Sequence, residues 1–221
     1  MNDAAEVPFE FDAAFYDAIY GSRTAEWCGD PNPNLVSEMT DVSPGSALDV
    51  GCGDGSDAVW LARHRWNVTA TDFSAIAIER NRRIPLDATV AERITWVQAD
   101  ITQWEPPRQY DLVSAHFMHL SLATRDGFFT RLAASVAPTG TLLVVGHHPS
   151  DVNVPDVKRS RPELLYTAED VQRLLSTDEW HIVVADKRSR DVTDLQGRIA
   201  TINDAILVAR KMARPIHRTS T

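Results

Sequence analysis

The sequence has no long hydrophobic run, little cysteine and no excess of positive charge. Its most continuous apolar stretch, Leu142 to Val145, is far shorter than the roughly 20 residues of a membrane-spanning helix. The formal net charge of −9 opposes the basic surface that binding to phosphate backbones requires, so we expect no nucleic-acid partner. The two cysteines, Cys28 and Cys52, are too few for a disulfide framework, and we expect free thiols.

The first twenty residues also lack the basic start and apolar core of a secretory leader. They carry five acidic side chains and no Lys or Arg, so we expect a cytoplasmic protein. With 221 residues, 43% of them hydrophobic and 24% charged, the chain can build one substantial core. We predict a cover segment over 1–32, a single domain over 33–212 and a flexible tail over 213–221.

Short apolar runs alternate with helical patterns through most of the chain. Helices are expected near 56–65, 74–83 and 121–137, and Thr167 with Asp170 matches the start of another helix. This alternation is typical of an α/β fold in which helices cover both faces of a parallel sheet. Ligands bind such sheets where the strands end. The expected strands are 46–50, 67–71, 94–98, 110–115, 140–146, 181–187 and 203–209.

Three alternate glycines, Gly51, Gly53 and Gly55, follow the first expected strand and precede a helix. Glycine lets the backbone turn tightly and approach a ligand with no side chain in the way. The run lacks the G-x-G-x-x-G spacing of dinucleotide-binding folds, and Asp54 and Asp57 place negative charge where a pyrophosphate would bind. The loop therefore favours a cofactor with a cationic centre, although any strand-to-helix turn can use glycine.

Acidic residues recur at the ends of the first three expected strands. Asp49 lies inside the first strand near the loop, Asp72 ends the second, and Asp100 follows the third. Asp72 is placed to accept hydrogen bonds from the hydroxyls of a ribose, and Asp100 from an exocyclic amine. Phe73 and Ile101 offer flat apolar surface to a purine. Each carboxylate alone is equally consistent with a helix cap, but together they predict a nucleoside-shaped cleft.

In order and spacing, residues 47–62, 68–73, 95–101 and 110–116 resemble the motifs of class I S-adenosylmethionine-dependent methyltransferases. The resemblance implies a Rossmann-like, seven-stranded, mostly parallel sheet whose last strand is antiparallel, and S-adenosylmethionine as the cofactor. The stretch that begins at Trp27 is similar to the cover segment of small thiol and tellurite methyltransferases. The expected cofactor-binding residues are Trp27, Asp49, Gly51, Cys52, Gly53, Gly55, Asp72, Phe73, Asp100, Ile101 and Ala115.

The same resemblance implies where each part of the cofactor lies. The methionine part is expected over Gly51 and Gly53, the ribose on Asp72, and the adenine beside Asp100. Trp27 either closes over the cofactor or is an ordinary core or surface tryptophan.

Four histidines follow two strands that are neighbours in such a sheet: His116 and His119 after the fourth, His147 and His148 after the fifth. A histidine there can act as general base and take a proton from a hydroxyl, thiol or amine, and we name His116 and His147 as catalytic candidates. Three of the four could instead bind zinc, but adjacent histidines tend to point opposite ways, so we predict no metal. The remaining alternative is ordinary solvated loop histidines.

Methyl transfer itself needs little acid–base help, because alignment with a good leaving group supplies most of the rate advantage. We expect methyl transfer to an O, N or S nucleophile of a small molecule. A NAD(P)-dependent oxidoreductase and a non-catalytic S-adenosylmethionine-binding protein are the alternatives. The loop 149–166 is expected to cover the acceptor. We expect a monomer or homodimer that binds neither nucleic acid nor membrane.

Overall fold

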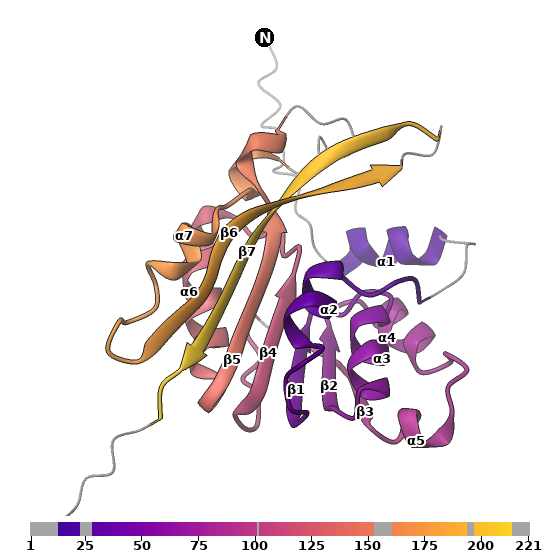
Figure 1. Ribbon diagram of the computed structural model, residues 1–221. Coiled ribbons are helices and arrows are strands. Elements are labelled where there is room, and N and C mark those ends of the chain that lie inside the picture. The colour runs from indigo at the N-terminus through magenta and orange to yellow at the C-terminus, as the bar shows by residue number, and fades with distance from the viewer. Residues whose placement is uncertain (1–12, 23–27, 101, 153–160, 194–196, 214–221) are drawn as a thin grey trace, which may run out of the picture.

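The computed structural model describes residues 13–22, 28–100, 102–152, 161–193 and 197–213, which fold around one seven-stranded sheet (Figure 1). The strands are β1 Ser46–Val50, β2 Asn67–Asp72, β3 Ile94–Gln98, β4 Tyr110–His116, β5 Val136–His147, β6 Trp180–Thr193 and β7 Ile199–Lys211. The α-helices are α1 Ala13–Ser22, α2 Pro33–Met39, α3 Ser56–Arg63, α4 Ala75–Asn81, α5 Ala88–Ala91, α6 Leu122–Ala134 and α7 Ala168–Gln172. Two short 3-10 helices are η1 Pro149–Asp151 and η3 Pro162–Leu164.

The strand order of the sheet is β3-β2-β1-β4-β5-β7-β6. β1 to β5 run parallel to one another, and β7 lies antiparallel between β5 and β6. This confirms the expected mostly parallel α/β sheet with an antiparallel last strand. The chain order reverses between β1 and β4, so ligand binding is expected where these two strands end.

One helix ends earlier than its sequence pattern predicts. α6 stops at Ala134, and Val136, which was expected in the helix, begins β5 and pairs with Tyr110. Val136 is buried in either arrangement, so apolar spacing alone does not separate a helix end from the start of a buried strand. The predicted helix start is confirmed, because Thr167 and Asp170 form a reciprocal capping box at α7.

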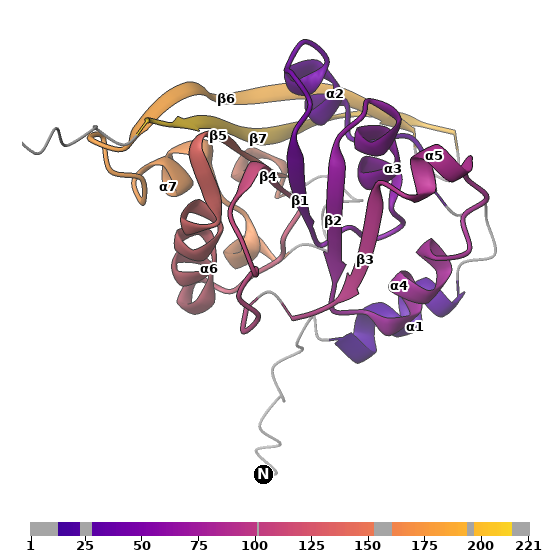
Figure 2. The same ribbon diagram turned by 90° about the horizontal axis from the view of Figure 1, so that it is seen from below.

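Helices cover both faces of the sheet. In Figure 2, α6 and α7 lie on one side of it and α3, α4 and α5 on the other. The α6 side buries Leu48, Val50 and Ala115, whereas the α3 side buries Ala47 and Leu112. Side chains that alternate along β1 and β4 thus point into two separate cores. Among the described residues, no helix is both long and apolar enough to cross a membrane.

The last two strands extend beyond the rest of the sheet. β5 ends at His147, opposite Asp204 of β7, but β7 continues to pair with β6 as far as the couple Thr193 and Ile199. In Figure 1 this extension and α1 both lie at the upper edge, where the parallel strands end. Both elements therefore border the edge at which the candidate site residues lie.

Candidate active site

The loop between β1 and α3 presents bare backbone, because each of its three glycines has a left-handed conformation. The angle φ is +69° at Gly51, +52° at Gly53 and +80° at Gly55, a region that other residues rarely adopt. A Cβ on Gly51 would lie 2.6 Å from Sδ of Met118, and one on Gly55 would lie 2.8 Å from the ring of Trp96. The loop therefore requires glycine both for its turn and for the close approach of its neighbours.

Asp72, at the end of β2, holds this loop. Its carboxylate accepts hydrogen bonds from the N–H groups of Gly53 at 3.0 Å and Ser74 at 2.8 Å. The N-cap of α4 is Ser74, whose hydroxyl accepts from the N–H of Ala77, so Asp72 is not the cap. Burial raises the pKa of Asp72, and the two N–H donors partly offset that rise. A carboxylate has further lone pairs, so Asp72 can still accept from a ribose hydroxyl.

Asp100 accepts hydrogen bonds from its own loop, whereas Asp72 accepts one from the glycine loop. It follows β3, and its oxygens accept from the hydroxyl of Thr102 at 2.6 Å and the side-chain amide of Gln103 at 2.9 Å. These contacts close a turn of the loop after β3 and cap none of the described helices, and an adenine contact by Asp100 stays a prediction. Trp27 and Ile101 lie outside the described residues.

The remaining expected cofactor residues flank the loop. Cys52 is buried, and its N–H donates to the carbonyl of Thr71 at 2.9 Å, which fixes the turn to β2. Burial raises the pKa of the Cys52 thiol well above its usual range. Ala115 lies fully buried on the α6 side of the sheet. Neither side chain adds a polar group to the site.

α1 brings two tyrosines over the loop and the end of β2. The ring of Tyr16 lies 5.4 Å from that of Phe73, centroid to centroid. The hydroxyl of Tyr20 lies 3.2 Å from the position that a Cβ on Gly53 would take. These tyrosines lie in the predicted cover segment, and no motif in the sequence distinguishes them.

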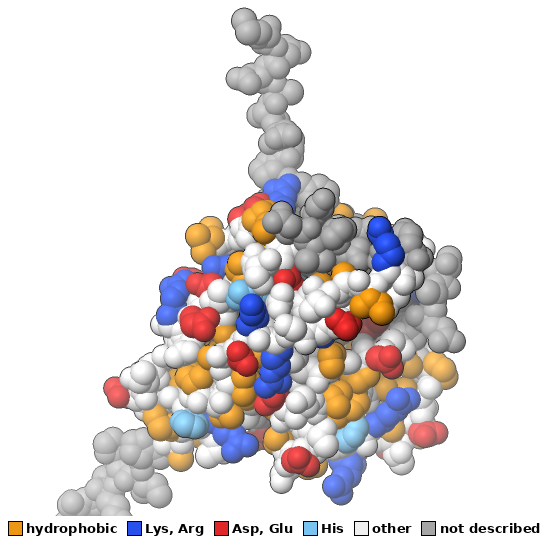
Figure 3. Space-filling model, turned by 45° about the horizontal axis from the view of Figure 1, so that its top comes forward, with side chains coloured by type: hydrophobic (Ala, Val, Ile, Leu, Met, Phe, Trp, Pro, Cys, Tyr) orange, Lys and Arg blue, Asp and Glu red, His pale blue; other side chains and the backbone are white. Residues whose placement is uncertain are grey.

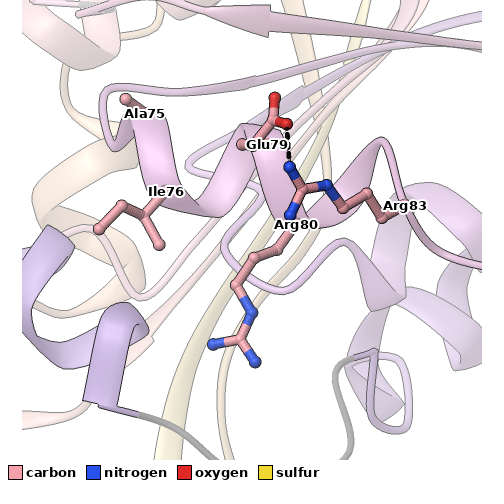
Figure 4. Close-up of a pocket in the computed structure, with 5 residues that line it drawn as sticks. All are labelled: Ala75, Ile76, Glu79, Arg80 and Arg83. Atoms are coloured by element: carbon pink, nitrogen blue, oxygen red, sulfur yellow. Dashed lines mark hydrogen bonds and ion pairs between the residues drawn. The ribbon is translucent and has the colours of Figure 1, made fainter.

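α4 anchors this helix. Asp17 accepts a hydrogen bond from the hydroxyl of Ser74, and the guanidinium of Arg80 donates to the carbonyl of Tyr20 at 2.5 Å. A pocket of about 360 Å³ lies on α4 (Figure 4), lined by Ala75, Ile76, Glu79, Arg80 and Arg83. None of these five residues belongs to the glycine loop or to the histidines, so the pocket is separate from the candidate site.

His116, the last residue of β4, forms a buried ion pair with Asp57 at the start of α3. Nδ1 lies 2.6 Å from a carboxylate oxygen of Asp57. Burial alone lowers the pKa of His116, but the carboxylates of Asp57, Asp49 and Asp204 outweigh burial and raise it. In turn, His116 lowers the pKa of Asp57 against the effect of burial. The charge of Asp57 is evident from the sequence, but its pairing with His116, 59 positions away, is not.

Asp49 lies on the same side of the sheet as His116. It stands in register with Ser114, and His116 follows two residues later on the same strand, so the three side chains share the α3 side. One carboxylate oxygen of Asp49 accepts from the hydroxyl of Ser114 at 3.4 Å. Burial, and then the charge of Asp57, raises the pKa of Asp49 to about 7. A cation bound beside it would restore the ionised form.

A second pair of imidazoles lies at the end of the neighbouring strand, β5. The ring of His147 stacks on those of Phe117 and His119, with centroids 4.5 Å and 5.5 Å away. The hydroxyl of Tyr16 lies 3.1 Å from Nδ1 of His119. Burial lowers the pKa of both histidines to about 4, so both are neutral at pH 7. Of these two histidines, the sequence favours His147 as a catalytic candidate, together with His116, but not His119.

The fourth histidine is turned to its own loop, where Nδ1 of His148 accepts from the N–H of Ser150 at 3.1 Å. Within the part of the chain that the structure describes, no group of three His, Cys, Asp or Glu side chains is arranged to hold a metal ion.

Figure 3 looks toward the strand-end edge and shows acidic and basic side chains interspersed over the described surface. Of the expected cover loop 149–166, residues 153–160 lie outside the described residues.

Comparison with known proteins identifies the domain. Residues 47–140 match a family described as a methyltransferase domain. The chain is 26% identical over 188 residues to trans-aconitate 2-methyltransferase of Acidovorax ebreus, an alignment covering 80% of this chain and 67% of that protein. It is 38% identical over 113 residues to an uncharacterized methyltransferase of Mycobacterium bovis, covering 50% of this chain and 55% of that protein. The alignments thus span about half to two thirds of these relatives.

Solved structures share the fold. TehB from Haemophilus influenzae has a TM-score of 0.66 at 19% identity, covering 90% of this chain and 66% of that chain. NodS from Bradyrhizobium japonicum, an N-methyltransferase in complex with S-adenosyl-L-homocysteine, has a TM-score of 0.64 at 18% identity, covering 90% and 98%. The bare glycine backbone, Asp72 and the buried carboxyl of Asp49 fit the S-adenosylmethionine of this family. Residues 47–140 thus match a methyltransferase domain, and the fold around them is similar to that of S-adenosylmethionine-dependent methyltransferases.

Proposed function

We propose that this chain methylates a small molecule whose attacking atom gives its proton to His147. The proposal depends on one observation: Nδ1 of His147 is buried and has no hydrogen-bond partner among the described residues, in a ring that is neutral at pH 7. S-adenosylmethionine, when bound, supplies a methyl group on a positively charged sulfur. A hydroxyl, thiol or amine that attacks this methyl must lose a proton, and a neutral imidazole nitrogen can accept it.

Tyr16 orients the second imidazole of the pair. Burial and the charge of Asp72 raise the pKa of Tyr16 to about 12, so its hydroxyl keeps its proton. We take this hydroxyl as the donor to Nδ1 of His119, 3.1 Å away, which leaves the hydrogen of the neutral ring on Nε2. We call the glycine loop with Asp72 and Phe73 the cofactor side of the site. The acceptor side is formed by His119 and His147. Because Tyr16 also packs on Phe73, its side chain contacts both sides.

The surroundings of His147 favour an apolar acceptor over a polyanion. Its neighbours are the rings of Phe117 and His119. The nearby guanidinium of Arg190 lies 5.6 Å over the ring of Phe117 and donates to Asp204 at 2.7 Å, so its charge is already paired. A carboxylate acceptor is ionised at neutral pH and needs no base. We therefore favour a hydroxyl, thiol or amine acceptor over a carboxylate such as that of trans-aconitate, which the names of the relatives contain.

A panel of matched acceptors tests this function. Benzyl alcohol, benzyl mercaptan, benzylamine, phenylacetate and trans-aconitate are offered to the protein with S-adenosylmethionine, and release of S-adenosylhomocysteine is measured. We expect turnover in the first three, reduced about 100-fold by His147→Ala and unchanged by His148→Ala. Turnover of carboxylates alone, insensitive to His147→Ala, would contradict the proposal. Cofactor binding without turnover in any broader panel would favour the non-catalytic alternative.

We propose a cytoplasmic protein, a monomer or homodimer, with a single domain over 33–212. The net charge of −9 supports the absence of a nucleic-acid partner. Size-exclusion chromatography with light scattering, and a DNA and RNA binding assay at low salt, test these expectations.

A further inference from the structure

A buried carboxylate on β7, that of Asp204, has only one of its two oxygens paired. Its side chain is 1% exposed, and Oδ1 has no hydrogen-bond partner among the described residues. The other oxygen, Oδ2, accepts from the side-chain amide of Asn34 at 3.0 Å and from Nε of Arg190 at 2.7 Å. Buried polar atoms in native proteins are nearly always paired, so Oδ1 indicates a ligand that donates a hydrogen to it.

Asp204 lies directly opposite His147, the proposed base. The two residues are register partners in the antiparallel pair of β5 and β7, so their side chains share one face of the sheet, with Cβ atoms about 5 Å apart. Nδ1 of His147 is also buried and also lacks a partner in the described part of the chain. As a base, this nitrogen carries no hydrogen. A carboxylate oxygen and an imidazole nitrogen at neighbouring positions thus each require a donor.

We infer that the acceptor is a primary aromatic amine whose nitrogen donates one hydrogen to Oδ1 of Asp204 and the other to Nδ1 of His147. A primary amine nitrogen carries two hydrogens and a lone pair, whereas a hydroxyl or thiol carries one hydrogen. The amine can therefore pair both atoms and still direct its lone pair at the methyl group. The inference rests on the proposed function, because it names the substrate class of the same acceptor side, and it makes Asp204 a specificity-determining residue.

The surroundings of the base favour an aromatic over an aliphatic amine. The ring of Phe117 stacks on His147 with centroids 4.5 Å apart and offers a flat apolar surface. An aliphatic amine is an ammonium ion at neutral pH and has no lone pair for attack, whereas an aromatic amine is a much weaker base and is uncharged there. Burial lowers the pKa of His147 to about 4, which suits transfer of a proton from the weakly basic methylated nitrogen.

The charges of the reaction also fit a nitrogen acceptor. The lone pair of the nitrogen forms the bond to the methyl carbon, the electrons of the carbon–sulfur bond remain on sulfur, and the positive charge passes from sulfur to nitrogen. The carboxylate of Asp204 stabilises this charge until the nitrogen gives one proton to Nδ1 of His147. A hydroxyl or thiol that loses its proton becomes an anion, which the same carboxylate repels.

Four acceptors of one shape test the inference on the wild-type protein: aniline, N-methylaniline, phenol and thiophenol. Release of S-adenosylhomocysteine from S-adenosylmethionine is measured and corrected for the uncatalysed rate. We expect kcat/KM for aniline to exceed that for phenol about tenfold. N-methylaniline, which has a single hydrogen on nitrogen, should react about tenfold more slowly than aniline, so that aniline gives the monomethyl product. A larger kcat/KM for phenol or thiophenol than for aniline would overturn the inference.

Asp204→Asn exchanges the unpaired acceptor for a donor. The amide oxygen can still accept from Asn34 and Arg190, which places the NH2 group at the position of Oδ1. We expect kcat/KM for aniline to fall about 30-fold and that for phenol to stay within about threefold, because the oxygen of phenol can accept from the amide. The matched control is Asp191→Asn, an exposed carboxylate of β6 that accepts from Thr201 at 2.8 Å and should leave both values unchanged.

Urea denaturation and affinity for S-adenosylhomocysteine separate this effect from a folding defect or a cofactor contact. Asp204→Asn should bind S-adenosylhomocysteine within about twofold of the wild type. An equal fall for aniline and phenol in the folded variant would overturn the inference. So would a loss of cofactor affinity with unchanged acceptor preference, since Oδ1 would then serve His116, to which Asp204 is electrostatically coupled.

If Asp204→Asn does not fold, the wild-type protein decides, because equal turnover of aniline and N-methylaniline would overturn the inference. The proposed function fails separately: turnover of every acceptor would then be insensitive to His147→Ala. Turnover of phenol and thiophenol in preference to aniline, if lost in His147→Ala, would leave the proposed function in place and remove the amine.

Discussion

The cofactor side and the acceptor side of this site both contain a buried histidine, yet the pKa values of the two rings are shifted in opposite directions. His116 lies against the carboxylate of Asp57, and its pKa is raised. His147 lies against the rings of Phe117 and His119, and its pKa is lowered to about 4. Both side chains would titrate near pH 6.5 in water.

Burial acts in the same direction on both rings, because it always disfavours the charged form. The difference therefore comes from the partners. A carboxylate in contact with His116 more than offsets the loss of water, whereas aromatic rings around His147 do not. A protonated ring suits a permanent contact with an anion, and a neutral ring suits acceptance of a proton. The same residue type is thus suited to anion binding on one side and, as we propose for His147, to proton transfer on the other.

The largest effect is expected from breaking the charged pair on the cofactor side. Asp57→Asn leaves His116 buried without its counter-ion and should lower the free energy of unfolding by about 3 kcal/mol near pH 6. Urea denaturation measures the change. Asp126→Asn, in the exposed pair with Arg173, is the control and should cost about 0.5 kcal/mol.

The pH dependence gives this prediction a sign. The folded pKa of His116 is raised, so its contribution is complete below the unfolded value of about 6.5 and is lost as the pH rises through the folded pKa. The lowered pKa of Asp57 keeps the pair intact down to acid pH, and the raised pKa of Asp49 also lowers stability as the pH rises. The difference between wild type and Asp57→Asn should therefore be smaller at pH 9 than at pH 6. An equal difference at both values would contradict the ion pair.

A second test removes the ribose acceptor of the cofactor side. Asp72→Ala deletes that acceptor and the bonds that hold Gly53 and Ser74, and should weaken S-adenosylhomocysteine about 30-fold by calorimetry. The turnover number measured at saturating cofactor should change less, because no described contact joins Asp72 to His147. Unchanged affinity would refute the assignment of Asp72 to the ribose.

The cofactor side was more predictable from sequence than the acceptor side, for a physical reason. The glycine loop and Asp72 depend on neighbours within about twenty positions, so their spacing alone predicts a turn beside a strand end. The pair of Asp57 with His116 spans 59 positions, and that of Tyr16 with His119 spans 103. Such contacts are set by how helices pack on the sheet, which no short pattern in the sequence records.

Local patterns also left genuine ambiguities. The position of Asp100 after a strand is consistent both with a contact to the cofactor and with a helix cap. In the structure its carboxylate accepts hydrogen bonds from its own loop. Val136 fitted the apolar stripe of a helix but begins a strand. All seven predicted strands are present, yet β6 and β7 are longer than the predicted 181–187 and 203–209. Beyond those apolar segments, polar residues continue the pairing of the two strands. Hydrophobic periodicity therefore locates elements well and their ends poorly.

The acceptor side can be tested through the pH dependence of turnover with a hydroxyl acceptor. A base with a pKa of about 4 remains neutral down to pH 5.5, so the turnover number should change little between pH 8 and pH 5.5. An ordinary histidine would lose about tenfold over the same range. The charged groups near His147 are Arg190, which lowers its pKa further, and Asp151, which raises it. A decline centred near pH 6.5 would contradict a desolvated base.

The smallest effect is expected at the residue that contacts both sides. Tyr16→Phe keeps the ring on Phe73 but removes the hydroxyl that lies 3.1 Å from Nδ1 of His119. Affinity for S-adenosylhomocysteine should stay within about twofold, while the turnover number should fall about threefold as His119 loses its fixed tautomer. Tyr16→Leu, which also removes the ring, should weaken the cofactor. If Tyr16→Phe instead changed cofactor affinity more than the turnover number, the Tyr16 hydroxyl would contribute to cofactor binding. His119, its partner, would then have to be counted with the cofactor-binding residues and His147 alone with the acceptor.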